Sequence, residues 1–324
     1  MKYSDNVLQL IGNTPLVRLG RVTSGSNPLI LAKLEFLNPG GSIKDRVGIA
    51  MILDAEKKGL LKSGSTIIEP SSGNTGVGLV IAGILHGYKV VITIPDKMSE
   101  EKVRLLQGYG AQVVVCPSDR PAGHPENYVG VARKIASETP NSYMPNQYAN
   151  PSNTRVHYET TGPEIWEQTE GKVTHFVAGM GTGGTISGVA KYLKGKNDKI
   201  QVIGVDPQGS ILQGIFRKEA NLEAKQYKTE GIGEDFLPET TDLSLIDDIV
   251  RVNDKESYNM ARRLAREEAL LVGSSSGAAV AGALKVSKDL SKKDVLVTIL
   301  PDRGERYLSK LYNDEWMKAQ GFLP

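Results

Sequence analysis

A lysine at the start of a predicted helix is the first residue whose type and position suggest chemistry. Lys44 closes the turn-rich segment NPGGSIK, residues 38–44, which follows a predicted strand. The positive end of a helix dipole disfavours a lysine at this place. A lysine amine attacks carbonyl carbons when desolvation or nearby positive charge lowers its pKa. Lys44 is therefore a candidate for Schiff-base formation, although this loop taken alone favours a solvated surface lysine.

A second loop, EPSSGNTG at residues 69–76, also lies between a predicted strand and a predicted helix. Hydroxyl side chains and glycines at a helix start present several N–H groups to an anion such as a carboxylate. Asn74 adds an amide donor able to reach a phenolic oxygen. An ordinary serine-rich helix start explains the same residues equally well.

A third loop, GMGTGGT at residues 179–185, follows a predicted strand and opens a helix. Its backbone N–H groups, two threonine hydroxyls and the helix dipole suit a phosphate. The loop also matches G-x-G-x-x-G, and Asp206 ends the next predicted strand at the distance expected of a ribose-binding carboxylate. A nicotinamide-dependent oxidoreductase is therefore an alternative. Against it, the motif lies in mid-chain behind two other glycine-rich loops, and Pro207 favours a turn.

A fourth loop, GSSSG at residues 273–277, precedes an apolar helix of small residues. A neutral hydroxyl from Ser275 would leave a facing pyridine nitrogen unprotonated. Taken alone, a serine helix cap is the better explanation. Four such loops are less easily explained as turns, because one ligand with an aldehyde, a phenolic oxygen, a ring nitrogen and a phosphate would use all of them.

Short apolar runs that alternate with helical patterns must position these loops. The runs rich in Val and Ile predict buried strands at 29–36, 66–68, 89–94, 112–115, 175–178, 201–205 and 295–300. Helices are predicted at 44–58, 75–86, 99–109, 128–138, 163–168, 184–193, 255–268 and 278–284. The alternation predicts an α/β fold with parallel sheets, which bind ligands beyond the carboxyl ends of their strands. Residues 208–246 lack a clear period and are predicted to form a long loop.

The composition restricts the class of protein. A net charge of +2 over 324 residues is too small for a nucleic-acid or membrane-surface binder, so small molecules are the expected partners. The single cysteine, Cys116, excludes an intramolecular disulfide, and the absence of a charged-then-apolar leader suggests a cytoplasmic protein. No metal site is expected, because metal-ligand spacing is absent around the four histidines, His86, His124, His157 and His175.

The order and the sequences of the loops resemble those of the fold-type II pyridoxal-phosphate (PLP) enzymes of the cysteine synthase and cystathionine β-synthase family. The resemblance runs from GNTPL at residues 12–16 to PDRGERY at residues 301–307, practically the whole chain. It implies two interlocked domains, each with a mostly parallel twisted sheet flanked by helices. A larger PLP-binding domain would comprise residues 1–39 and 146–324, and a smaller mobile substrate-binding domain residues 40–145. It also suggests a homodimer.

The resemblance implies roles for residues in all four loops. Lys44 would carry PLP as a Schiff base, Asn74 would bind its phenolic oxygen, and Ser275 would face its ring nitrogen. The phosphate would be held by Gly181, Thr182, Gly183, Gly184 and Thr185. The substrate would be bound by Ser71, Ser72, Gly73, Thr75, Gln147, Tyr148, Gly231 and Asp235. A threonine is more usual in the family than Ser71.

Several details look more like the cystathionine β-synthase branch than like the O-acetylserine sulfhydrylases. The segment QYAN at residues 147–150 has a tyrosine where sulfhydrylases usually have phenylalanine, and EGIGEDF at 230–236 has an acidic pair where they commonly have Ala-Gly. The expected reaction replaces the β-substituent of serine or cysteine with homocysteine, giving cystathionine, and releases hydrogen sulfide when cysteine is the donor. The alternative is cysteine synthesis from sulfide and O-acetylserine or O-phosphoserine.

The expected catalytic residues are Lys44, which would take the substrate α-proton, and Lys44 or Tyr148, which would protonate a departing hydroxide. Haem is not expected, because the resemblance covers the catalytic core only, without the family's haem-binding extension before Met1 or its regulatory domains after Pro324. A non-enzymatic scaffold with the same fold is a further alternative, disfavoured because all four loops are intact.

Overall fold

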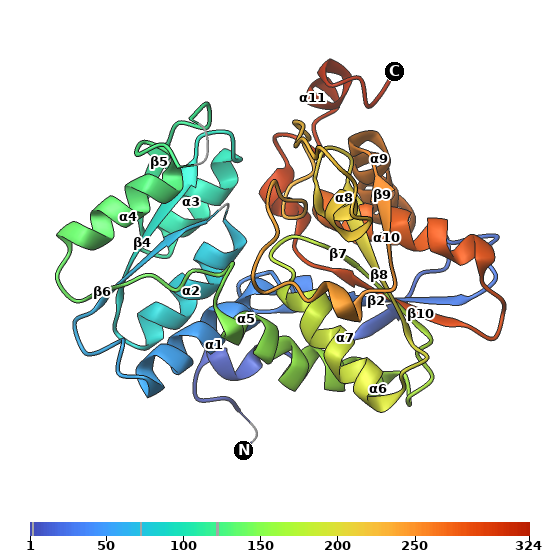
Figure 1. Ribbon diagram of the computed structural model, residues 1–324, viewed down its shortest axis with the longest axis horizontal. Helices are drawn as coiled ribbons and strands as arrows, with labels where there is room; N and C mark the ends of the chain where they lie inside the picture. Colours follow the sequence, from blue (N-terminus) through green and yellow to red (C-terminus); the bar gives the residue numbers. More distant parts are fainter. Residues whose placement is uncertain (2, 72, 121–122) are drawn as a thin grey trace. The chain divides into compact units, whose positions relative to one another are not determined.

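The structure is a computed structural model that describes residues 1, 3–71, 73–120 and 123–324. The chain divides into two compact units, whose elements are labelled in Figure 1. The first unit comprises Met1–Ile11 and Asn38–Asn153, and the second comprises Gly12–Leu37 and Thr154–Pro324. Each unit contains a sheet of mostly parallel strands flanked by helices, which confirms the α/β fold expected from the alternating pattern.

The first unit is built on a four-stranded sheet in the order β5-β4-β3-β6, with all its strands parallel. The strands are β3 (Thr66–Pro70), β4 (Lys89–Pro95), β5 (Gln112–Cys116) and β6 (Ser142–Tyr143). The helices are α1 (Lys44–Lys57), α2 (Asn74–Leu85), α3 (Glu100–Gly108) and α4 (Tyr128–Glu138), and a short 3₁₀ helix spans Val7–Leu10. Figure 1 shows α4 on one face of this sheet and α2 and α3 on the other.

The second unit is built on a six-stranded sheet in the order β1-β2-β10-β7-β8-β9, in which only β1 runs antiparallel to its neighbour. The strands are β1 (Leu16–Arg18), β2 (Leu29–Leu34), β7 (His175–Gly179), β8 (Gln201–Pro207), β9 (Asp248–Val252) and β10 (Val295–Leu300). The α-helices are α6 (Gly162–Gln168), α7 (Gly184–Lys196), α8 (Leu212–Phe216), α9 (Asp254–Glu267), α10 (Ser274–Val286) and α11 (Asp314–Ala319).

Shorter helical segments complete the chain. Helix α5 (Pro151–Val156) begins in the first unit and ends in the second, and it continues directly into a π-helix at His157–Thr161. Short 3₁₀ helices occupy Glu35–Leu37, Leu243–Leu245, Ser287–Asp289 and Gly304–Tyr307.

Both faces of the larger sheet are buried, as parallel sheets require. Val205 of β8 belongs to the apolar core that α10 completes, and α10 approaches so closely that a Cβ built on Gly282 would lie 2.5 Å from Val205 Cγ2. Val202 points to the opposite face by the alternation of the strand, and it is also fully buried. The continuous apolar runs in the sequence therefore indicate strands whose sheet is covered on both faces.

The predicted strands and helices are all present, and most of their bounds are close to those expected. The exception is α10, which begins at Ser274 and not at residue 278, so Ser275 lies in the first turn of the helix and not in a loop before it. The apolar and helical patterns of the sequence do not predict three further strands, β1, β6 and β9. They also do not predict the helical segments α5, α8, α11 and the π-helix. In the described residues, no helix is both long enough and apolar enough to cross a membrane.

Candidate active site

Lys44 is the first residue of α1, and a close contact between α1 and α2 fixes its backbone. A Cβ built on Gly78 of α2 would lie 2.4 Å from the carbonyl oxygen of Lys44. From the other side, a Cβ on Gly48 of α1 would lie 2.3 Å from the carbonyl carbon of Gly78. Any larger side chain at either glycine would separate the helices. The contact therefore places Lys44 one turn from the start of α2, where Asn74 is the first residue.

The turn before Lys44 is held by side chains of the same loop. The N–H of Lys44 donates to Ser42 Oγ over 3.2 Å, and the N–H of Gly40 donates to the buried carboxylate of Asp45 over 2.5 Å. Lys44 itself is half-buried. A lysine held at a helix start and partly removed from water has the setting that a nucleophilic amine requires.

Ser71 stabilises the start of α2 from within the loop. Its Oγ accepts the N–H groups of Gly73 and Gly76, each over 3.1 Å, and its side chain is buried. Both bonds use the oxygen lone pairs, so the hydroxyl proton stays available to a bound anion. Ser72, its neighbour in the predicted carboxylate site, lies outside the described residues.

Thr75 and Gln147 come together, although they are far apart in the sequence. Thr75 Oγ1 donates to Gln147 Oε1 over 2.5 Å, and both side chains are buried. Because its oxygen is occupied, the Gln147 amide directs its two N–H groups to other acceptors. The pair can therefore present hydrogen-bond donors to a carboxylate.

Glu69 holds the segment that carries Gln147, a role that sequence reasoning does not predict. Its two carboxylate oxygens accept the backbone N–H groups of Gln147 and Asn146 over 3.0 and 2.9 Å. Burial raises the pKa of Glu69 to about 7, and the two N–H donors oppose this rise. The signal that sequence offers is a carboxylate in an otherwise apolar strand. Tyr148 follows Gln147 directly and is half-buried.

The predicted phosphate loop joins β7 to α7 in the second unit. Gly183 has φ of 80°, and a Cβ there would lie 1.8 Å from Thr241 Oγ1. The neighbouring carbonyl of Thr182 accepts a short hydrogen bond from Thr240 Oγ1. Both the backbone conformation and the lack of space therefore require glycine at position 183.

The start of α7 fits a phosphate. The first N–H groups of an α-helix have no acceptor within the helix, and the first turn of α7 carries no acidic residue. An anion there would face the positive end of a 13-residue helix, with the hydroxyls of Thr182 and Thr185 beside it. The first turns of α2 and α10 also carry no acidic residue.

The turn at residues 231–233 connects the phosphate loop with Ser275. The N–H of Gly233 donates to the carbonyl of Met180 over 2.6 Å, and a Cβ on Gly181 would lie 2.8 Å from the carbonyl oxygen of Gly231. A Cβ on Gly231 would in turn lie 3.8 Å from Ser275 Oγ. Gly231, Gly181 and the buried Ser275 therefore lie together, whereas Asp235 is exposed at the surface of the unit.

The carboxylate of Asp206 is bonded within the protein. It is therefore not free to bind a ribose, as the nicotinamide-dependent alternative requires. Its Oδ2 accepts the N–H of Gln213 in α8 over 2.9 Å, and the side chain is fully buried. Burial raises the pKa of Asp206, opposed by hydrogen bonds from Ser210 and Gln213. The G-x-G-x-x-G match is thus not accompanied by an available ribose-binding acid.

Other reactive groups have ordinary explanations. Cys116 is buried, and burial together with the nearby Asp96 raises the pKa of its thiol, which makes it a poor nucleophile. Within the described part of the chain, no three His, Cys, Asp or Glu side chains are grouped so that they could hold a metal ion.

Comparisons with known proteins show the family of the chain. Residues 7–302 match the family model described as pyridoxal-phosphate dependent enzyme. The chain is 47% identical over 319 residues to a cystathionine beta-synthase of Dictyostelium discoideum, covering 98% of this chain and 64% of that protein. It is 46% identical over 325 residues to a cystathionine beta-synthase of Rattus norvegicus, covering 99% of this chain and 58% of that protein. The chain therefore spans less than two thirds of these curated relatives.

Two solved structures share the fold. An O-acetylserine dependent cystathionine beta-synthase from Helicobacter pylori matches with a TM-score of 0.87 and 39% identity, over 96% of this chain and 99% of that one. A hydrogen sulfide-producing enzyme from Fusobacterium nucleatum matches with a TM-score of 0.88 and 36% identity, over 94% of this chain and all of that one. The family expected from the four loops is confirmed, and the chain belongs to the pyridoxal-phosphate dependent enzymes, which implies PLP as its cofactor.

Proposed function

We propose that this chain replaces the β-substituent of serine or cysteine with homocysteine, giving cystathionine, and releases hydrogen sulfide when cysteine is the donor. The observation that carries the proposal is the turn at 231–233, which touches both the phosphate loop and Ser275 and leads directly into the acidic pair Glu234 and Asp235. Relatives named cystathionine beta-synthase support it.

The proposed cofactor residues come from the four glycine- and serine-rich segments of the sequence. Lys44 would hold the aldehyde of PLP and Asn74 its phenolic oxygen. The loop Gly181, Thr182, Gly183, Gly184 and Thr185 would hold its phosphate. Ser275 would face its ring nitrogen with a neutral hydroxyl, which favours elimination over transamination. When bound, PLP would withdraw electrons from the α-carbon of the substrate.

The proton transfers fall to two side chains. The Lys44 amine would take the substrate α-proton as a general base. A hydroxide leaving from serine needs a proton, which Lys44 or Tyr148 would supply, whereas an acetate leaving group needs none.

The proposed substrate residues are hydrogen-bond donors for a carboxylate, with an acid at the entrance. Thr75 and Gln147 already contact each other. The other proposed residues of this group, Ser71, Ser72 and Gly73, come directly before Asn74 in the sequence. A homocysteine molecule also brings an ammonium group that needs a polar partner. The exposed carboxylate of Asp235, after Gly231, would meet that ammonium.

The test is a matrix of steady-state rates, with serine, cysteine and O-acetylserine each assayed against homocysteine and sulfide. We expect cystathionine from serine or cysteine. Asp235→Gly combined with Tyr148→Phe should lower cystathionine formation more than it lowers cysteine formation from O-acetylserine and sulfide. Glu239→Gly is the matched control, since Glu239 is an exposed acid of the same segment.

The second candidate is an O-acetylserine or O-phosphoserine sulfhydrylase. The name of the Helicobacter pylori neighbour supports O-acetylserine as a donor, although the same name makes that protein a cystathionine beta-synthase. A wild-type protein that makes cysteine rapidly from O-acetylserine, and no cystathionine from any donor, would establish this reading instead.

The remaining proposals concern the context of the enzyme. We propose a cytoplasmic homodimer that acts on small amino acids and thiols rather than on nucleic acid or membranes. The proposed domains are a larger PLP-binding domain of residues 1–39 and 146–324 and a smaller substrate-binding domain of residues 40–145.

A further inference from the structure

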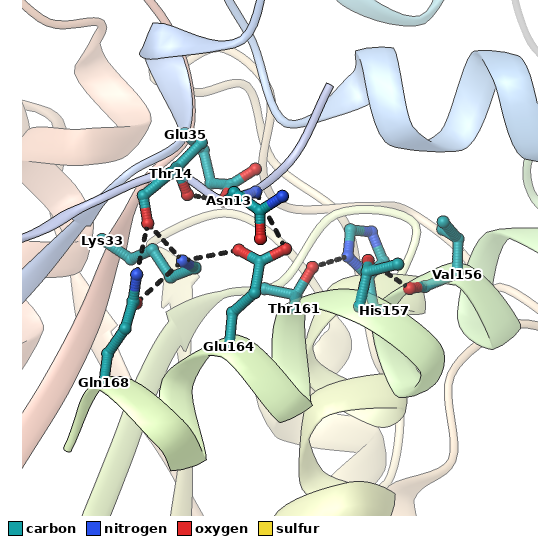
Figure 2. A network of polar contacts seen from close by, with 10 residues as sticks. Asn13, Thr14, Lys33, Glu35, Val156, His157, Thr161, Glu164 and Gln168 are labelled. Atoms are coloured by element: carbon teal, nitrogen blue, oxygen red, sulfur yellow. Dashed lines mark hydrogen bonds and ion pairs between the residues drawn. The ribbon is translucent and has the colours of Figure 1, made fainter. Parts of the chain in front are cut away.

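The π-helix at His157–Thr161 is a rare element that lies beside the phosphate loop. Single π turns inserted between α-helices are frequent at functional sites. Here the π-helix lies between α5 and α6, and its first residue, His157, is fully buried. Figure 2 shows the His157 ring directed toward Thr161 at the other end of the same π turn.

Helix α7 packs directly against the start of this π-helix. A Cβ built on Gly188 would lie 2.3 Å from the carbonyl oxygen of Thr154 and 2.8 Å from His157 Cβ. Gly188 and Thr185 are three residues apart and so share one face of α7. The close approach at Gly188 therefore brings the His157 ring to Thr185, in the first turn of α7.

A buried ion pair anchors α6, the helix that continues the π-helix. Lys33 of β2 is fully buried, and its Nζ contacts Glu164 Oε2 over 2.7 Å and donates to the carbonyl of Thr14 over 2.7 Å and to Gln168 Oε1 over 3.0 Å (Figure 2). Removing one partner of such a buried pair is strongly destabilising. The π-helix is thus held at one end by α7 and at the other by β2.

The His157 ring joins two hydroxyl groups. Its Nδ1 lies 2.9 Å from Thr161 Oγ1, and its Nε2 lies 3.2 Å from Thr185 Oγ1. A neutral imidazole has one N–H donor and one acceptor nitrogen, so the tautomer decides the direction of both bonds.

The burial of Thr161 identifies the tautomer. Thr161 is fully buried, and within the described residues its hydroxyl contacts His157 Nδ1 and no other polar atom. A buried hydroxyl proton needs an acceptor, and Nδ1 is the one in reach. Nδ1 therefore accepts from Thr161, which leaves the ring proton on Nε2.

We propose that His157 is a positioning residue for the phosphate loop, held as the Nε2–H tautomer by Thr161. Nε2–H then donates to Thr185 Oγ1, and the hydroxyl proton of Thr185 is directed to the phosphate. The opposite tautomer would draw that proton toward His157 and turn oxygen lone pairs toward the phosphate oxygens. This inference rests on the proposed function, in which Thr185 holds the phosphate of PLP.

The first experiment reads the tautomer directly. The chain has four histidines, so nitrogen NMR of the holoenzyme with ¹⁵N-labelled histidine gives a simple spectrum, in which His157→Gln identifies the His157 signals. We expect the proton on Nε2. A proton on Nδ1, or a doubly protonated ring, would overturn the proposal.

The second experiment measures the affinity of the apoenzyme for PLP. Thr161→Val removes the hydroxyl that orients His157 and should weaken PLP binding at least about tenfold, the scale of one hydrogen bond to a charged group. Thr161→Ser should restore it. Thr160→Val is the matched control, because it removes a neighbouring π-helix hydroxyl that bonds to the carbonyl of Val156.

Thr185→Val distinguishes the proposed phosphate role of Thr185 from the proposed positioning role of His157. If it leaves PLP affinity unchanged, Thr185 does not hold the phosphate and that part of the proposed function fails. If it weakens PLP binding while Thr161→Val matches the wild type, the phosphate role stands and the role of His157 is refuted. Phosphorus NMR of bound PLP should shift in Thr161→Val and return in Thr161→Ser, which a general loss of stability would not produce.

Discussion

Glu69 is the residue whose replacement most sharply tests the proposed substrate role of Gln147. Its carboxylate is buried and accepts two backbone N–H groups, one from Asn146 and one from Gln147. Glu69→Gln keeps the shape but replaces one acceptor oxygen with an NH₂ group. One of the two N–H groups then faces a donor. An unsatisfied buried donor costs about 1–3 kcal/mol at any pH, and the displaced Gln147 should raise KM for the amino-acid substrate.

The pH dependence of stability isolates the charge on Glu69. Burial raises its pKa from 4.5 to about 7 in the folded protein. The folded state therefore binds more protons than the unfolded state between these values, and the stability contributed by the group is lost as pH rises through that window. Since one pKa unit corresponds to about 1.4 kcal/mol, the loss amounts to about 3 kcal/mol.

The assay is urea unfolding of the wild type and Glu69→Gln at about pH 5 and about pH 8, values that bracket most of this window. Glutamine does not titrate, so the stability of the variant does not fall with pH through this group. The free energy of unfolding of the wild type, minus that of the variant, should fall by up to about 3 kcal/mol from the lower to the higher pH. A difference that rises with pH would mean that the two N–H donors outweigh burial and keep Glu69 charged, and the reasoning would be refuted.

Three further changes test the cofactor residues. Lys44→Ala should abolish turnover and the visible absorbance of bound PLP, and a variant with normal spectrum and rate would remove Lys44 from the site. Gly183→Ala should weaken PLP binding at least about tenfold and lower the melting temperature, because its Cβ would overlap Thr241; unchanged affinity and melting would contradict this packing. Ser275→Asp should still bind PLP but slow β-replacement and change the spectrum, since a carboxylate favours a protonated ring nitrogen. Unaltered spectra and kinetics would place Ser275 elsewhere.

The fold could be predicted largely because parallel strands buried on both faces are continuous apolar runs. What escaped prediction was too short or too polar for such a pattern. β1 has three residues and β6 has two, so neither completes an alternation. β9 follows the aperiodic segment directly, and its sequence DIVRV interrupts the apolar run with an arginine. The π-helix has no periodicity of its own, because it is a single turn between two α-helical segments.

The site could be predicted at the level of loops but not of contacts. Lys44, Asn74, the phosphate loop and Ser275 stand out because glycines and small polar residues cluster at helix starts. The partners that orient such loops are single side chains on distant elements. Glu69 is one of them, since nothing in the sequence indicates which N–H groups its carboxylate meets. His157 shows no metal-ligand spacing, and only its two threonine neighbours in the fold suggest a use for it.

Several internal hydrogen bonds of the candidate site have the same effect on its hydroxyl and amide groups. Ser71 accepts two backbone N–H groups, so its own proton is free to point outward. Thr75 uses its proton on Gln147, and there the amide N–H groups become the outward donors. The proposed tautomer of His157 would do the same for Thr185. In each case the protein fills acceptor positions from inside and leaves donors for the ligand, as anions such as carboxylate and phosphate require. A chain with the same loop sequences but without Thr161 should therefore keep the fold of these loops and bind anions less tightly.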